Sequence, residues 1–101
     1  MKDATDVPLQ TAEQAAHTLS AARRLTEYAN MNAISDLETA IATAYAAFSG
    51  STANVRINLS GIKAAQYNKR IREKLDTIQK QVEQDQKAAH SVLTARIGKQ
   101  T

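Results

Sequence analysis

Cysteine and tryptophan are both absent from the 101-residue sequence, and aromatic residues make up only 4% of it. Without cysteine the chain has no disulfide framework and no thiol chemistry, which excludes the small disulfide-stapled secreted scaffolds. One proline and three glycines leave few places where a helix must end. No apolar run approaches the ~18 residues that a membrane-spanning helix needs, so we expect no membrane insertion.

The first residues also lack a targeting signal. Residues 1–6 show no basic segment followed by an apolar core, which is the pattern of a cleaved signal peptide. We therefore expect a cytoplasmic protein, and any secretion would follow a route that does not depend on a signal peptide.

The abundant residue types favour helices. Alanine is used heavily, and glutamine, lysine, arginine and glutamate lose little conformational freedom on entering a helix. Thirteen basic and ten acidic residues give a net charge of +3. The two signs are interleaved, which is typical of a solvated helical surface. The composition therefore predicts an all-α protein.

The first half of the chain, about residues 8–48, has apolar residues at steps of three and four. This spacing places them on one face of a helix. The pattern is interrupted at residues 30–32, where either one long helix changes phase or two helices meet at a kink. We favour a single arm. Beyond the interruption a heptad pattern includes Ile34, Leu37 and Ile41.

Phe48, Ser49 and Gly50, near the midpoint of the chain, predict a turn over residues 49–51. Glycine accepts the left-handed conformation that ends many helices, and a following serine or threonine can cap the next one. The second arm then covers about residues 52–97. Two arms joined by a short loop lie antiparallel. We therefore expect residues 1–101 to form a single helical-hairpin domain.

The second arm carries a strict heptad of aliphatic residues, Ile71, Leu75, Ile78 and Val82. With Ile34, Leu37 and Ile41 of the first arm, they would form an apolar stripe that a lone hairpin cannot cover. We expect this stripe to be a partner interface that completes a four-helix bundle. The partner would be a second small helical protein or a second copy of the chain.

Asp85 falls in the same heptad position as these aliphatic residues. A carboxylate there is costly unless it reaches water or a partner. Either the stripe is open to water at this point, or Asp85 is a polar residue that selects the register or the partner. Asn68 in the same stripe allows the same two interpretations.

No arrangement of residues typical of an active site is apparent. There is no glycine-rich phosphate loop, and the serines have no base in a recognisable motif. We interpret His17 and His90, which lie in different arms, as surface histidines at the open end of the hairpin. The sequence predicts a non-enzymatic protein with no cofactor and no metal site.

The densest basic segment covers residues 68–74. Nucleic-acid binding requires such charges on one face beside groove-reading or aromatic residues. Glu73 and Asp76 dilute this charge, so we interpret the segment as a solvated helix face. Nucleic-acid binding around Arg70 is the lesser alternative.

The predicted hairpin with Phe48-Ser49-Gly50 at its middle resembles the WXG-type (ESX-like) small proteins of type VII secretion, which have Trp-x-Gly at the turn. With phenylalanine in place of tryptophan, it is most similar to the targeting factors or chaperones that accompany LXG toxins. The resemblance implies a protein that binds the helical N-terminal region of an LXG-type toxin, or that is secreted with it.

The export signal of that family is an aromatic residue followed four residues later by an acidic one. No aromatic residue follows Tyr67, so a partner would supply the signal. Asp85 is the candidate polar residue for specificity or export. A small helical chaperone or immunity-type protein of another secretion or toxin system stays as the alternative.

Overall fold

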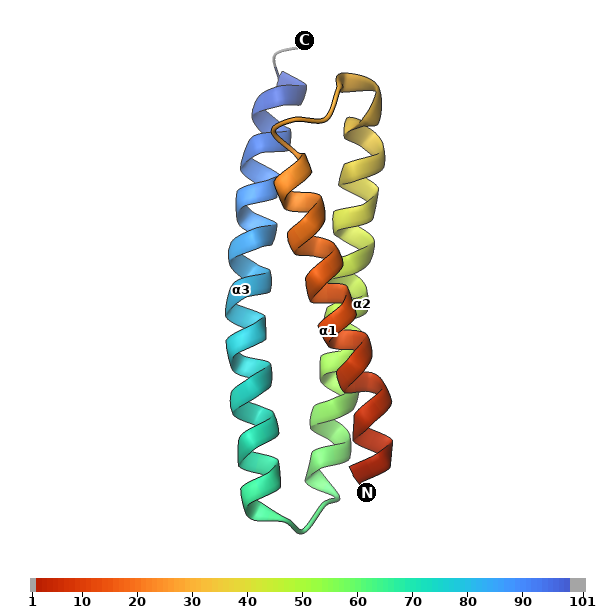
Figure 1. The fold of residues 1–101 in the computed structure, drawn as a ribbon, viewed down its shortest axis with the longest axis vertical. Coiled ribbons are helices and arrows are strands. Elements are labelled where there is room, and N and C mark those ends of the chain that lie inside the picture. The colour runs from red at the N-terminus through yellow and green to blue at the C-terminus, as the bar shows by residue number, and fades with distance from the viewer. Residues whose placement is uncertain (1, 99–101) are drawn as a thin grey trace.

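Three long helices, joined by two short connections, run along the length of the molecule (Figure 1). The computed structural model describes residues 2–98, with side chains from residue 5 onward. The elements are α1 (Lys2–Leu25), the short 3-10 helix η1 (Met31–Ala33), α2 (Ile34–Ser60) and α3 (Ala65–Gly98). The molecule is 55 Å long and 18 × 17 Å across. The predicted all-α class is confirmed, since residues 2–98 contain helices and no strand.

The predicted turn at residues 49–51 is wrong, because α2 continues through it. Gly50 has no positive φ angle, and the Ser51 hydroxyl donates to the carbonyl oxygen of Ala47 at 2.6 Å, as in a regular helix. A single glycine costs a helix only about 1 kcal/mol relative to alanine, and the alanine-rich sequence before it offsets that cost. Phe48 is buried in the core, with 3% of its surface exposed, rather than placed at a hairpin tip.

The chain reverses direction after α1 instead, so the expectation of one continuous first arm is also wrong. Asn30 caps the helix that follows the reversal: its Oδ1 accepts a hydrogen bond from the backbone N–H of Ala33 at 3.2 Å. Arg96 of α3 holds the connection by donating to the carbonyl oxygen of Thr26 at 2.7 Å. The interruption in the apolar pattern therefore marks a change of direction between two helices.

The second reversal, at residues 61–64, is closed by Asn68 of α3. Its Nδ2 atom donates to the carbonyl oxygen of Leu59 at 3.1 Å and to that of Ile62 at 2.8 Å. The last carbonyl groups of a helix have no partner within the helix. Asn68 therefore caps the end of α2, which accounts for an amide at an otherwise apolar heptad position.

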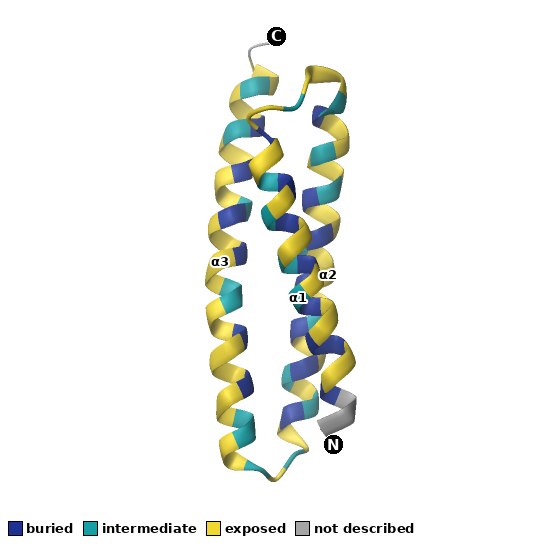
Figure 2. Cartoon of the chain, viewed as in Figure 1, coloured by how far each residue is buried: buried dark blue, intermediate teal, exposed yellow. Residues whose placement is uncertain are grey.

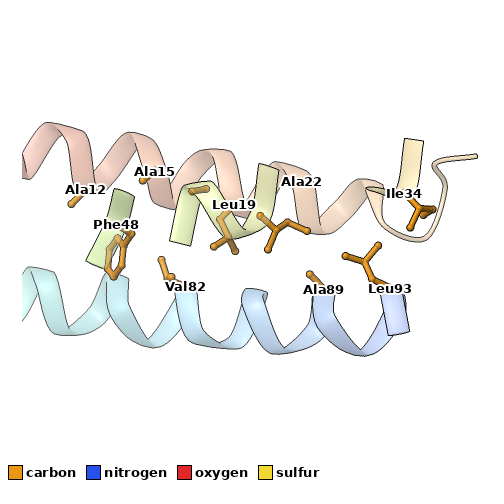
Figure 3. Close-up of a cluster of buried hydrophobic side chains, with 11 residues drawn as sticks. Ala12, Ala15, Leu19, Ala22, Ile34, Phe48, Val82, Ala89 and Leu93 are labelled. Atoms are coloured by element: carbon orange, nitrogen blue, oxygen red, sulfur yellow. The ribbon is translucent and has the colours of Figure 1, made fainter. Parts of the chain in front are cut away.

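The core lies along the axis between the three helices. Figure 3 shows Leu19 of α1, Phe48 of α2 and Val82 of α3 in one of its two clusters. The second cluster, toward the α2–α3 connection, consists of Leu9, Val55, Leu59, Ile71 and Leu75. In Figure 2 the buried positions of each helix face the other helices and the exposed positions cover the outside.

The apolar stripe that was expected to bind a partner is covered within one chain. Its buried members are Ile34, Ile41, Ile71, Leu75 and Val82. Leu37 and Ile78 are partly buried and pack against the same core. A lone hairpin would leave this stripe open, but the reversal after α1 makes a third helix that covers it. The structure therefore gives no support to the inference that these seven residues require a partner.

Candidate functional site

Among the grooves beside α3, two contain a histidine, and one of these lies against α1 and the other against α2. The α1–α3 groove has a volume of about 370 Å³ and contains Glu13 and His17. The α2–α3 groove has a volume of about 320 Å³ and contains Glu38 and His90. Both volumes lie at the lower end of the range of small-molecule sites. Each groove thus brings together a carboxylate and an imidazole.

The α1 wall of the first groove follows from helical spacing. Glu13 and His17 are four residues apart, so their side chains lie on the same face of α1, and Ser20 continues that face by one more turn. His17 is exposed, so its imidazole is accessible from solvent. The Ser20 Oγ atom accepts a hydrogen bond from the Arg24 guanidinium at 3.1 Å. This wall presents a carboxylate, an imidazole and a hydroxyl in sequence along the groove.

The α3 wall supplies Thr77, Ile78 and Gln81. Lys74, one turn earlier on α3, places its Nζ atom 3.3 Å from Oε1 of Glu13 and so joins the two walls. The Glu13 side chain is 34% exposed and that of Lys74 is 48% exposed. An ion pair this open contributes little to stability. In the structure it brings the Glu13 carboxylate and the Lys74 ammonium together at the edge of the groove.

Gln81 connects this groove to a buried ion pair behind it. Its Nε2 atom donates to Oδ1 of Asp85 at 3.2 Å, and Nε of Arg23 lies 3.0 Å from the same oxygen. Asp85 is 3% exposed, so the interpretation that it is simply hydrated is wrong. It links α3 to α1 within the chain. Its role in selecting the register of these helices stays a prediction.

The α2–α3 groove contains a comparable set of polar side chains. Glu38 and Tyr45 of α2 face Gln86 and His90 of α3 across it. Glu38 and His90 are both exposed. The expectation that the two histidines are surface residues is confirmed, but they line different grooves rather than one shared end.

Two side chains of the basic segment at the start of α3 contact neighbouring side chains of the same helix. Nζ of Lys69 lies 4.0 Å from Oε1 of Glu73, and the Arg70 guanidinium lies 5.6 Å from the centre of the Tyr67 ring. These contacts agree with the interpretation as a solvated helix face. The absence of nucleic-acid binding stays a prediction.

Two kinds of site are absent from the part of the chain that the structure describes. No three His, Cys, Asp or Glu side chains of that part come together as a metal ion would require. Over residues 2–98, no helix combines the length and the apolar character of a bilayer span.

The α1–α3 groove was not predicted from the sequence, although the spacing of the residues in its α1 wall could have indicated it. Glu13 and His17 at a spacing of four are a readable feature of one helix face. Thr77 and Lys74 belong to this site only because α3 packs beside α1, and a two-arm hairpin with its turn at residues 49–51 does not predict that neighbour.

Comparison with known families gives a match over most of the chain. The family model described as formiminotransferase-cyclodeaminase matches residues 1–77, which include α1, η1, α2 and the first part of α3. Glu13, His17, Ser20 and Thr77 lie inside the matched segment, and His90 lies outside it. No curated protein matches the chain, and no solved structure matches it.

This match overturns the resemblance to WXG-type proteins and the type VII secretion role that the resemblance implied, including the LXG-toxin partner. The resemblance depended on an aromatic-x-Gly turn at Phe48-Ser49-Gly50, and these residues lie within a continuous helix. The expectation of a non-enzymatic protein is corrected as well, because the matching family is one of enzymes.

Proposed function

Because the chain belongs to the formiminotransferase-cyclodeaminase family, we propose that it is a helical domain of a folate-dependent cyclodeaminase whose α1–α3 groove receives the formimino group of the substrate. The observation that carries the proposal is the position of Glu13 and His17. They share one groove, and both lie within the residues that the family model matches. A fold by itself does not establish a function, so the proposal depends on the chemistry of these side chains.

A cyclodeaminase joins ring closure to the loss of ammonia. A second nitrogen of the folate attacks the formimino carbon, whose C=N double bond becomes a single bond. The resulting tetrahedral carbon is bonded to three nitrogens, which are the folate nitrogen that carried the formimino group, the attacking nitrogen and the departing nitrogen. The attacking nitrogen must lose a proton and the departing nitrogen must gain one. The bond to the departing nitrogen then breaks, ammonia leaves, and the ring carbon regains its C=N bond.

His17 is suited to both proton transfers. An imidazole near neutral pH takes a proton as a base and returns it as an acid. It is exposed and lines the groove, so a bound substrate can reach it. In this proposal it accepts the proton of the attacking nitrogen and delivers a proton to the nitrogen that leaves.

Glu13 has a complementary role in the proposal. A formimino group is an amidine-type base and carries positive charge when protonated, so a nearby carboxylate attracts it. The Glu13 side chain lines the groove, and Nζ of Lys74 lies 3.3 Å from its Oε1 atom. Ala16 and Ile78 supply apolar surface beside these polar groups. We also propose that the chain acts in the cytoplasm, as expected for an enzyme of histidine degradation.

The test measures ammonia release from a formimino-folate by the purified full chain. His17→Gln should lower the turnover rate by about 10²-fold or more, which is the typical contribution of a general acid–base residue. His90→Gln is the matched control, because this histidine is also exposed and lines the other groove. Its rate should stay close to that of the unaltered chain.

Two results would contradict the proposal. One is the absence of ammonia release by the unaltered chain at any substrate concentration. The other is an equal rate for His17→Gln and the unaltered chain. If His90→Gln alone lost activity, the reaction would belong to the α2–α3 groove instead.

A further inference from the structure

The α2–α3 groove collects polar side chains that have no partner within the described part of the chain. They are Glu38 and Tyr45 of α2, and Gln86, His90 and Thr94 of α3. Among the described residues, none of these five side chains forms a hydrogen bond or an ion pair with another residue. Their donors and acceptors are therefore available to a molecule that enters the groove.

The α1–α3 groove differs in this respect. Its carboxylate, on Glu13, has an ion pair with Lys74 at 3.3 Å, and the amide of Gln81 donates to Asp85 at 3.2 Å. Each of these polar groups is already bound within the chain. The Glu38 carboxylate of the α2–α3 groove has no such cation among the described residues.

The charge of the α2–α3 groove also favours a cation. Of the described residues, no lysine or arginine lines the groove beside Glu38. Arg56 of α2 pairs with Asp76 at 3.0 Å instead, and Arg96 of α3 donates to the carbonyl oxygen of Thr26 at 2.7 Å. In a chain with a net charge of +3, this groove is therefore a place where a positive charge is attracted rather than repelled.

Glu38 and Tyr45 mark the two ends of the α2 wall of the groove. Their heptad spacing places them on one face of the helix. Seven residues correspond to about 10 Å along the axis, at 1.5 Å per residue. Ile41 and Ala42 line the groove between these two levels.

The surface between the polar groups is apolar. Ile41 and Leu93 are buried members of the core and form the floor of the groove. Ile97 is 38% exposed and extends this aliphatic surface. The ring of Tyr45 is half-buried and packs against the same core. An apolar lining with a few polar groups is the usual composition of a small-molecule site.

We propose that the α2–α3 groove is a binding site for a small arylalkyl amine, whose ammonium group pairs with Glu38 and whose aromatic ring packs against Tyr45. A carboxylate accepts charge-assisted hydrogen bonds from an ammonium group. Two aromatic rings attract one another in offset or edge-to-face arrangements. The alkyl chain of the ligand spans the distance between the two residues and lies on Ile41 and Leu93. The volume of about 320 Å³ suits a small amine.

This site does not depend on the proposed function. The α2–α3 groove shares no lining residue with the α1–α3 groove that contains Glu13 and His17. Amine binding and ammonia release can therefore be measured separately, and either result can fail without the other.

The test follows the amide signals of the isotope-labelled full chain by NMR while phenylbutylamine is added. We expect saturable shifts at Ile41, Ala42 and Leu93, with a Kd of about 0.1–1 mM for a ligand of this size. Phenylbutanol has a similar body with a neutral head group and should bind about three- to fivefold more weakly. Phenylbutyrate, whose head group is negative, should give no saturable shifts, because its carboxylate would face Glu38.

Glu38→Gln keeps the size of the side chain and removes its charge. It should raise the Kd for phenylbutylamine by about three- to fivefold, the effect of losing an exposed ion pair. Asp36→Asn is the matched control, because it removes an exposed carboxylate of α2 that does not line the groove. It should leave this Kd unchanged. Tyr45→Leu should raise the Kd by about threefold or more through the loss of the ring contact.

Four results would overturn the proposal. One is a set of shifts that does not saturate below about 10 mM phenylbutylamine. Another is an equal Kd for phenylbutylamine and phenylbutyrate, which would show that the groove does not recognise positive charge. Equal effects of Glu38→Gln and Asp36→Asn would assign the binding to the overall charge of the chain. Shifts confined to His17 and Thr77 would place the amine in the α1–α3 groove instead.

Discussion

Nε of Arg23 on α1 lies 3.0 Å from Oδ1 of Asp85 on α3, in a pair whose two sides differ in exposure. The Asp85 side chain is 4% exposed and that of Arg23 is 38% exposed. Nε of Arg23 is not aligned to donate a hydrogen bond, and Oδ2 of Asp85 is buried without a hydrogen-bond partner. The pair is therefore held by electrostatic attraction. The buried negative charge of Asp85 is compensated by Arg23 and by the hydrogen bond from Gln81.

Removing one member of this pair should destabilise the chain. Arg23→Ala leaves the Asp85 carboxylate buried without its cation, so the free energy of unfolding should fall by about 2–3 kcal/mol. This is less than the loss for a fully buried pair, because Arg23 is partly in water. The double variant Arg23→Met with Asp85→Leu should be at least as stable as the unaltered chain. Urea unfolding followed by circular dichroism measures both, and a loss below about 0.5 kcal/mol for Arg23→Ala would contradict the expectation.

Gly50→Ala should stabilise the chain. Position 50 is helical and open to solvent, so alanine should raise the free energy of unfolding by about 0.5–1 kcal/mol. A glycine in a left-handed turn would respond in the opposite way. A lower melting temperature would therefore indicate that residues 49–51 form the turn predicted from the sequence.

Asn68→Ala should weaken the α2–α3 connection. It removes two hydrogen bonds, to the carbonyl oxygens of Leu59 and Ile62, and should lower the free energy of unfolding by about 1–2 kcal/mol. Asn32→Ala is the matched control, since Asn32 is an exposed asparagine of η1. A surface change of that kind typically stays within about 0.5 kcal/mol. Equal effects of the two substitutions would show that Asn68 does not act as a cap.

The all-α class could be predicted from the spacing of the apolar residues along the sequence. The aliphatic residues assigned to one stripe, such as Leu75 and Val82, are buried in the structure, because helical periodicity depends on the sequence alone. The place of the reversal was misjudged, because two local signals of similar strength competed. Gly50 and Asn30 each mark a possible end of a helix, and each signal is worth about 1 kcal/mol.

The candidate site was less predictable than the core. The pairing of Glu13 with His17 is a property of one helix and can be read from four-residue spacing. The Lys74 contact with Glu13, at 3.3 Å, joins residues 61 positions apart. No local rule predicts such a contact, because it requires α1 to reverse into α2 and α3 to return beside α1.

The amino-acid sequence by itself determined that this chain is helical, which side chains are apolar and at what period, and that a polar Asp85 would interrupt an aliphatic series. Only the tertiary structure decided that residues 2–98 form three long α-helices and that Arg23 compensates Asp85. The physical reason is one of range. Helix propensity and periodicity act between residues a few positions apart, whereas burial and ion pairing depend on segments that meet only after the chain has folded.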